Sequence, residues 1–183
     1  MKTSPTRILL AAAALLSLAA LSHADIERLD LAQMMTKADD ALLGTITKRE
    51  VFRVDHPKDG PELYFTTLTI EGRSLKDDRS LSVNVMFMGG FIDRTHGVYN
   101  SAAPSADEVK IGNRVVAFYK WTKNMGGDVS GNALCAWHGG LYRTFDAKKG
   151  VIVQGRGAGY AIPTNVEITT FKHEIAELAK KPK

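Results

Sequence analysis

The sequence predicts a mainly β fold, a small barrel or sandwich with helices at its two ends. Strand patterns follow one another at close spacing between residues 41 and 154, and helical periodicity is confined to the ends of the chain. The chain has 183 residues and a single cysteine, Cys135, so no internal disulfide can support the fold. Closure into a barrel would also hide the strand edges that a soluble β protein must protect.

A short helix is predicted directly after Asp30, which can cap it. Four apolar residues then follow at the spacing of one helical face: Leu31, Met34, Met35 and Ala38. The helix is expected to end near Asp39 and Asp40, where Thr, Val and Ile become frequent.

Five to seven strands are predicted from runs of β-branched, aromatic and alternating apolar residues. Their ranges are 41–54, 62–71, 81–87, 114–121, 133–137, 141–145 and 151–154. Gly44, inside the first strand, indicates a bend or a bulge. The first two strands are separated by a turn with two prolines and the pair Asp59-Gly60.

Two loops interrupt these strands. Gly89–Gly112 is long and irregular, and compact domains rarely carry such a segment unless it binds a partner or covers the core. Asn124–Asn132 is rich in glycine and is predicted to be a second, mobile loop. A closing helix follows, capped by Thr169 or Thr170, with an apolar face of Phe171, Ile175, Leu178 and Ala179.

The first 24 residues are typical of an export signal. Lys2 and Arg7 precede an apolar run from Ile8 to Leu21, and Ser22-His23-Ala24 offers a small-x-small cleavage site. The run is shorter than the roughly 20 residues that cross a bilayer. We therefore expect a signal peptide over 1–24 and one domain over 25–183, periplasmic or secreted, without stable membrane insertion after cleavage. Anchoring by an uncleaved N-terminus is the alternative.

Charge and cysteine content narrow the classes of partner. Loss of Lys2 and Arg7 would lower the net charge from +4 to +2, which does not predict nucleic-acid binding. Cys135 lies in an apolar segment and is expected to be a buried thiol, with a reactive thiol or an intermolecular disulfide as the alternatives. No cofactor is expected, because Tyr160 stands where a dinucleotide-binding motif beginning at Gly155 needs glycine.

Three segments together resemble netrin-like domains, the group that contains tissue inhibitors of metalloproteinases, and small exported bacterial proteins of similar shape. They are Ala38–Ile46, where an Ala-Asp pair leads into an apolar strand, Gly112–Phe118, where Gly precedes an apolar run, and the strand ending at Gly89-Gly90. The resemblance covers roughly residues 38–145. It implies a five-stranded, OB-like antiparallel barrel, closed or partly open, with a helix packed on it.

The resemblance does not carry an inhibitory function with it. Inhibitors of metalloproteinases bind the zinc of their target through an N-terminal cysteine, which this chain lacks, and their disulfide framework is missing too.

Catalytic and metal-binding patterns are weak. Asp93, His96, Cys135 and His138 could bind zinc if the fold brought them together, but their spacing matches no established zinc motif. A Cys–His nucleophile is disfavoured because Cys135 and His138, three apart in a strand, would point to opposite faces.

Aromatic residues provide a third possibility. Tyr99, Trp121 and Tyr142 are candidates for stacking on sugar rings or on side chains of a partner, with Tyr99 and Tyr142 the ones most expected to be exposed. Trp121 and Trp137 could equally belong to the core.

We expect a non-enzymatic β-barrel domain that binds a protein or a cell-envelope component through Gly89–Gly112 and Asn124–Asn132. The alternatives are a metal-assisted hydrolase using Asp93, His96 and His138, and a glycan-binding module.

Overall fold

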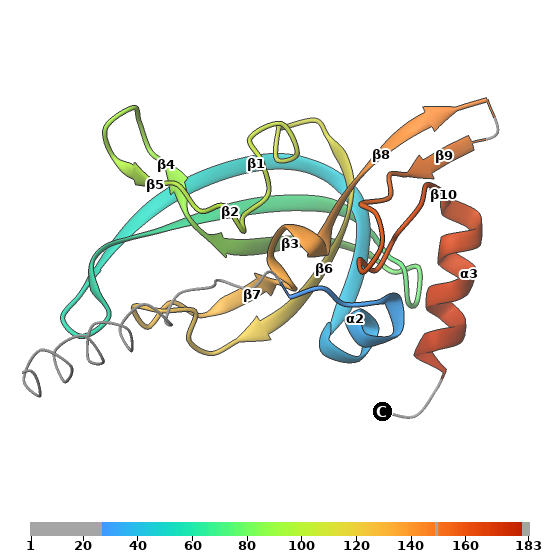
Figure 1. Ribbon diagram of the computed structural model, residues 1–183, viewed down its shortest axis with the longest axis horizontal. Coiled ribbons are helices and arrows are strands. Elements are labelled where there is room, and N and C mark those ends of the chain that lie inside the picture. The colour runs from blue at the N-terminus through green and yellow to red at the C-terminus, as the bar shows by residue number, and fades with distance from the viewer. Residues whose placement is uncertain (1–26, 149, 181–183) are drawn as a thin grey trace, which may run out of the picture.

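The computed structural model describes residues 27–148 and 150–180, and it confirms a mainly β protein (Figure 1). The signal peptide predicted over Met1–Ala24 lies outside the described residues. Five strands form a closed barrel, and further strands and two helices are attached to it. None of the helices in 27–148 and 150–180 is both long enough and apolar enough to cross a membrane.

The barrel strands are β1 (Asp40–His56), β2 (Gly60–Ser74), β3 (Ser80–Met88), β6 (Arg114–Thr122) and β7 (Gly131–Leu134). Their order is β1-β2-β3-β7-β6, and a further antiparallel pairing of β1 with β6 closes the ring. The junction between β3 and β7 is parallel and rests on two residue pairs, Val85 with Asn132 and Met86 with Ala133. That junction is therefore the shortest of the five.

Smaller elements extend from the barrel. β8 (Leu141–Ala147) pairs with β6 and continues into β9 (Gly150–Val153) and β10 (Val166–Glu167). β4 (Gly90–Phe91) and β5 (Gly97–Val98) form a separate hairpin that projects from the barrel.

β1 and β2 are long strands of the barrel wall, and they bend strongly along their course (Figure 1). Gly44 faces Gly72 across the two strands, and an irregularity in register follows between Ile46 and Lys48. The bulge thus lies a few residues beyond Gly44, the glycine that marks the bend in the sequence. One extra residue at such a bulge increases the twist that barrel closure requires.

The helices cover one outer side of the barrel. α2 (Leu31–Lys37) begins with a capping box, in which Asp30 accepts from the N–H of Gln33 and the Gln33 side chain accepts from the N–H of Asp30. α3 (Ile168–Ala179) starts one residue before Thr169, and Glu167 occupies the cap position without a side-chain bond. The prediction of a threonine cap was therefore wrong.

Two apolar cores result. The barrel interior holds alternate residues of the barrel strands, among them Leu42, Leu68, Val85 and Ala117. The second core fills the space between the barrel wall and the helices, and its largest members are Met34, Phe118, Tyr142, Phe171 and Ile175. Phe118 meets both Tyr142 and Phe171 edge to face.

Two aspartates at the start of β1, Asp39 just before it and Asp40 as its first residue, hold strands together. Asp39 accepts a hydrogen bond from the backbone N–H of Trp121 at 2.7 Å, which ties the start of β1 to β6. The buried Asp40 accepts from the hydroxyl of Ser74 at 2.9 Å, which ties β1 to the end of β2. The Ala-Asp pattern at this position is thus explained by strand anchoring.

A predicted strand over 133–137 was partly wrong. β7 ends at Leu134, and the chain turns into the 3₁₀ helix η2 (Trp137–Gly140). Ala136 and Trp137 both adopt positive φ values, 47° and 54°, which extended strands do not contain. Gly139 and Gly140 are buried in this turn, where a side chain on Gly140 would meet the backbone oxygen of Cys135.

Candidate functional site

Four of the seven exposed large apolar side chains in the described residues lie on or beside the β4–β5 hairpin, inside the predicted loop Gly89–Gly112. Phe91 and Ile92 are about half exposed, Val98 is 45 % exposed and Tyr99 is 80 % exposed. A contiguous group of large apolar side chains on one projecting element is unusual for a free surface, and such patches mark interaction sites.

The tip of the hairpin is organised by Asp93. Its carboxylate accepts from the backbone N–H groups of Thr95 and His96 and from the Thr95 hydroxyl. These bonds, with that from the His96 ring, hold the pKa of Asp93 well below its usual range. The tip is therefore a self-contained turn that presents the neighbouring apolar residues in a defined geometry.

A strained turn lies beside the hairpin. Ala136 and Trp137 occupy the left-handed region one after the other, although neither is glycine. Such conformations cost on the order of 1–3 kcal/mol each and persist where the surrounding structure enforces them. Here Nδ1 of His138 donates to the carbonyl of Ala102 at 3.1 Å, and Nε2 bonds with the Tyr160 hydroxyl at 3.1 Å.

These two features enclose a groove of about 610 Å³, which we call the hairpin groove. Tyr99 and Val98 contribute from the hairpin, Trp137 contributes from the strained turn, and Leu63 and Met88 contribute from β2 and β3. A volume of this size is typical of ligand pockets. Its largely apolar lining suits side chains of a partner.

The zinc candidates do not assemble into one site. His96 and Asp93 contact each other at the hairpin tip, with 2.9 Å between Nδ1 and Oδ2. Both ring nitrogens of His138 are engaged elsewhere, with Ala102 and Tyr160. Within residues 27–148 and 150–180, no group of three or more His, Cys, Asp or Glu side chains could hold a metal ion.

Cys135 is half-buried next to the helix-side core. Burial raises the pKa of its thiol to about 11, and Asp39 adds to the effect. The thiol is therefore protonated at neutral pH, which removes the nucleophile that a Cys–His reaction needs.

The three aromatic candidates lie in different surroundings. Tyr99 is exposed in the hairpin groove and Trp121 is 55 % exposed above another groove, so neither belongs to the core. Tyr142 is 1 % exposed, and the expectation that it would be exposed was wrong. It lies on β8 between Phe118 and the guanidinium of Arg156, and burial raises its pKa to about 12.

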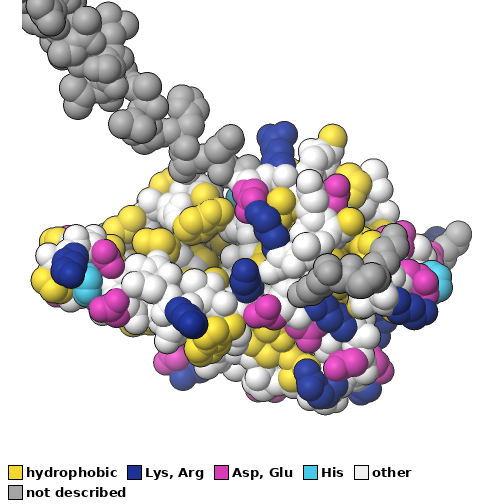
Figure 2. Space-filling model, turned by 90° about the horizontal axis from the view of Figure 1, so that it is seen from below, with side chains coloured by type: hydrophobic (Ala, Val, Ile, Leu, Met, Phe, Trp, Pro, Cys, Tyr) yellow, Lys and Arg dark blue, Asp and Glu magenta, His cyan; other side chains and the backbone are white. Residues whose placement is uncertain are grey.

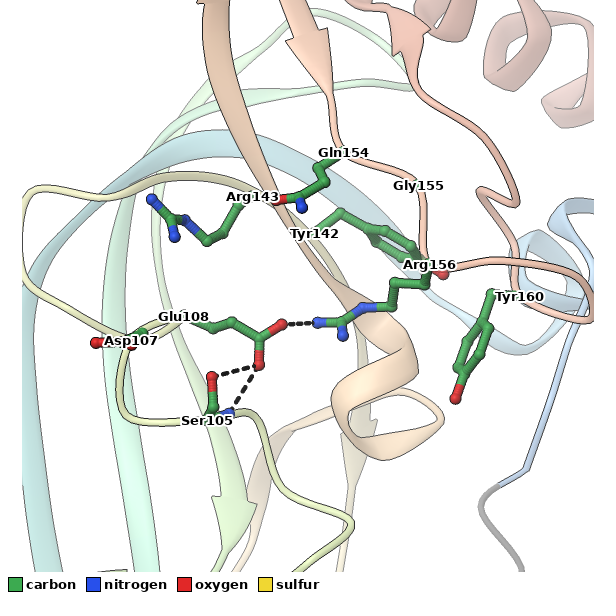
Figure 3. A pocket seen from close by; sticks show the side chains of 9 residues that line it. All are labelled: Ser105, Asp107, Glu108, Tyr142, Arg143, Gln154, Gly155, Arg156 and Tyr160. Carbon is green, nitrogen blue, oxygen red and sulfur yellow. Dashed lines mark hydrogen bonds and ion pairs between the residues drawn. The ribbon is translucent and has the colours of Figure 1, made fainter.

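A polar pocket of about 330 Å³ separates the long loop from β8 and β9 (Figure 3). Arg156 crosses it to pair with Glu108, and its guanidinium also donates to the carbonyl of Leu141. Glu108 in turn accepts from the N–H and hydroxyl of Ser105. The central charges of this pocket are already satisfied within the protein, so they fasten the loop to the barrel.

Charge is evenly distributed on the face shown in Figure 2. Lysine, arginine and acidic side chains alternate there, with hydrophobic side chains between them. A concentrated basic surface, which nucleic-acid binding requires, is not present on that face.

The comparisons with known proteins give no relatives. No family model matches the chain, and neither does a curated protein or a solved structure.

The sequence indicates the importance of the long loop Gly89–Gly112, but not that Trp137 lines the same groove. Trp137, which the pattern predicts to end a strand, with a place in the core as one alternative, lies instead in the 3₁₀ turn η2 and lines the hairpin groove. The pair Gly139-Gly140 was the available indication that the strand would end there.

Proposed function

We propose that this protein is a non-catalytic β-barrel binding module that engages a protein or a cell-envelope component through the hairpin groove. The observation that carries the proposal is the exposure of Tyr99, which lines the same groove as Trp137. Burying a large aromatic side chain contributes strongly to binding, and aromatic residues dominate the energetics of interfaces.

Strain in the turn supports the same site. Two consecutive left-handed residues are unfavourable for folding, yet they orient Trp137 toward the hairpin. Backbone strain of this kind is common at sites where the binding geometry is formed before the ligand binds. The neighbouring Asp93 turn also stiffens the hairpin before any partner arrives.

We further propose that the barrel is of the OB type. The strand order β1-β2-β3-β7-β6 with closure onto β1, and the parallel junction of β3 with β7, support this assignment. Small Greek-key barrels of that type use their loops and outer strand faces for recognition. The same proposal includes the resemblance to netrin-like domains, which implies a barrel of this type.

Site-specific crosslinking tests the groove. A photoreactive amino acid at Ser101, an exposed residue of the groove lining, is expected to give one discrete adduct in cells that produce the protein. Tyr99→Ser should reduce that adduct at least tenfold. Ile111→Ser is the matched control, because Ile111 is 64 % exposed but lies outside the groove. An adduct that persists with Tyr99→Ser, or that never forms, would contradict the proposal.

Export is proposed on the basis of the leader-like residues 1–24. The protein recovered outside the cytosol should begin at Asp25, which intact-mass spectrometry determines directly. Recovery of the full-length chain from the cytosol alone would contradict export without affecting the hairpin groove.

A further inference from the structure

β3 has one edge that its neighbouring strands leave largely unoccupied. On one side it pairs with β2 along its whole length, from Ser80 opposite Arg73 to Met88 opposite Phe65. On the other side β7 pairs with Val85 and Met86 alone. The first part of the strand, Ser80–Val83, thus has a second edge without a strand partner in the described chain. We call this segment the free edge.

The hydrogen bonds at the two ends of the β2–β3 ladder show which backbone groups point to the free side. Gly89 donates to Tyr64 at one end, and Ser74 donates to the carbonyl of Arg79 at the other. In an antiparallel ladder, these bonds place the even-numbered residues of β3 in non-hydrogen-bonded pairs. The N–H and C=O groups of Ser80 and Ser82 therefore point away from β2.

Further along β3, several of these outward groups have partners. Met86 pairs with β7, the carbonyl of Asn84 accepts from the Asn132 amide, and the carbonyl of Met88 accepts from the Asn100 amide. For Ser82, no hydrogen bond outside the β2–β3 ladder occurs in residues 27–148 and 150–180. Its donor and its acceptor are open to a ligand.

A groove of about 720 Å³ lies against this edge. Ser82 and Val83 line it from β3, and Ser130 lines it from the β6–β7 loop. Trp121 lines it from β6, with its ring 55 % exposed and its backbone held by Asp39. The groove thus combines a row of backbone hydrogen-bonding groups with an aromatic surface.

The chemistry of the groove favours a polypeptide over a sugar. Oligosaccharides are held by amide and hydroxyl side chains around an aromatic ring, and each of the two amides in this groove already has one end bonded within the protein. Asn84 Oδ1 accepts from Thr69 at 2.9 Å, and Asn132 Nδ2 donates to the Asn84 carbonyl at 3.3 Å. The outward backbone groups of Ser80 and Ser82 lack a strand partner, and they repeat every second residue, which is the spacing that an added strand requires and a sugar does not.

We propose that the free edge binds an extended peptide segment as an additional strand, with an apolar side chain of that peptide packed on Trp121. The peptide backbone would bond with the N–H and C=O of Ser82, and the free edge would support about four residues of peptide, or roughly 13 Å. This site is separate from the hairpin groove and does not depend on the function proposed for it.

A display library of random ten-residue linear peptides provides the probe, selected on the mature protein. Affinity is measured by fluorescence of a Trp137→Phe variant, in which Trp121 is the remaining tryptophan. We expect peptides with apolar residues at alternate positions. A series with single N-methyl groups should lose affinity at least tenfold at every second residue, because each methyl group removes one strand hydrogen bond.

Two variants locate the site. Ser82→Pro removes the outward N–H and no bond to β2, so it should weaken binding at least tenfold, whereas Ser82→Ala should leave it unchanged. Trp121→Ala should weaken binding as well, and because it removes the fluorescent ring, its affinity is measured by isothermal titration calorimetry with a selected peptide. If the Ser82→Pro variant does not fold, the series of N-methylated peptides still tests whether the peptide binds as an added strand. An empty selection, a uniform N-methyl response, or quenching of Trp121 by a tetramer of β-1,4-linked N-acetylglucosamine in place of peptide would overturn the proposal.

Discussion

Gly44 and Gly72 face each other across the paired strands β1 and β2, shortly before the irregularity in register between Ile46 and Lys48. Neither position has room for a side chain. A Cβ on Gly72 would lie 2.1 Å from the Leu43 carbonyl oxygen, and one on Gly44 would lie 2.5 Å from that of Glu71. The close approach of the two backbones depends on both residues being glycine.

Gly72→Ala is therefore expected to lower the free energy of unfolding by about 3 kcal/mol, because the added methyl group meets backbone that cannot move aside cheaply. Urea denaturation measures the change. Gly139→Ala is the control, since a Cβ there has ordinary contacts of 3.5 Å or more. Equal stability of the two variants would show that β1 and β2 can separate at this point.

The ion pair between Glu108 and Arg156 should make the free energy of unfolding depend on pH in the acidic range. Burial works against the charged form of Glu108, but the Ser105 N–H and Arg156 outweigh it, so its pKa is lowered from 4.5. A group with a lowered pKa in the folded state stabilises above its unfolded value, and the contribution is lost as the pH falls through the folded value. Glu108→Gln should lower the free energy of unfolding by about 1–3 kcal/mol at pH 7 and by much less at pH 3.

Urea titrations at both pH values test this dependence. Glu174→Gln, at an exposed position on α3, is the control and should change stability little at either pH. A cost of Glu108→Gln that stayed constant down to pH 3 would contradict the role assigned to the carboxylate.

Cys135 should react slowly while the protein is folded. With its pKa raised to about 11, the thiolate fraction at pH 8 is on the order of 10² lower than for a free cysteine. Alkylation by iodoacetamide, followed by mass spectrometry, should therefore be about a hundred times slower in buffer than in urea. Rapid alkylation of the folded protein, or a disulfide-linked dimer on a non-reducing gel, would restore the reactive-thiol alternative.

The two histidines proposed as zinc ligands should behave differently. His138→Ala removes bonds to Ala102 and Tyr160 and should cost about 1–2 kcal/mol of stability. His96→Ala, on the exposed hairpin tip, should cost less than about 0.5 kcal/mol. Thermal unfolding measures the stability of the two variants, and elemental analysis of the same samples measures their zinc content. One zinc per chain, lost in both variants, would instead support the hydrolase alternative.

Local patterns predicted much of the fold because they depend on neighbouring residues. Asp30 and the apolar spacing after it indicated α2, and the alternation from Leu81 to Phe87 indicated β3. The same reasoning failed at Trp137, because a left-handed turn held by contacts with distant residues has no period to detect.

The candidate sites were less predictable. The length of Gly89–Gly112 indicates its importance. The burial of Tyr142 has no such local sign, because its neighbours on β8 do not reveal that Phe118 and Arg156 cover it. The free edge of β3 could not have been found either, since it depends on how short β7 is and where it pairs.

By itself, the sequence determined the β character, most of the strand positions and the lack of disulfide support, because all of these follow from the residues present and their local order. Tertiary structure alone decided which aromatic rings face solvent, which polar groups are already bonded and which strand edge stays open. The physical reason is that burial and hydrogen bonding are set by residues far apart in sequence, brought together when the barrel closes.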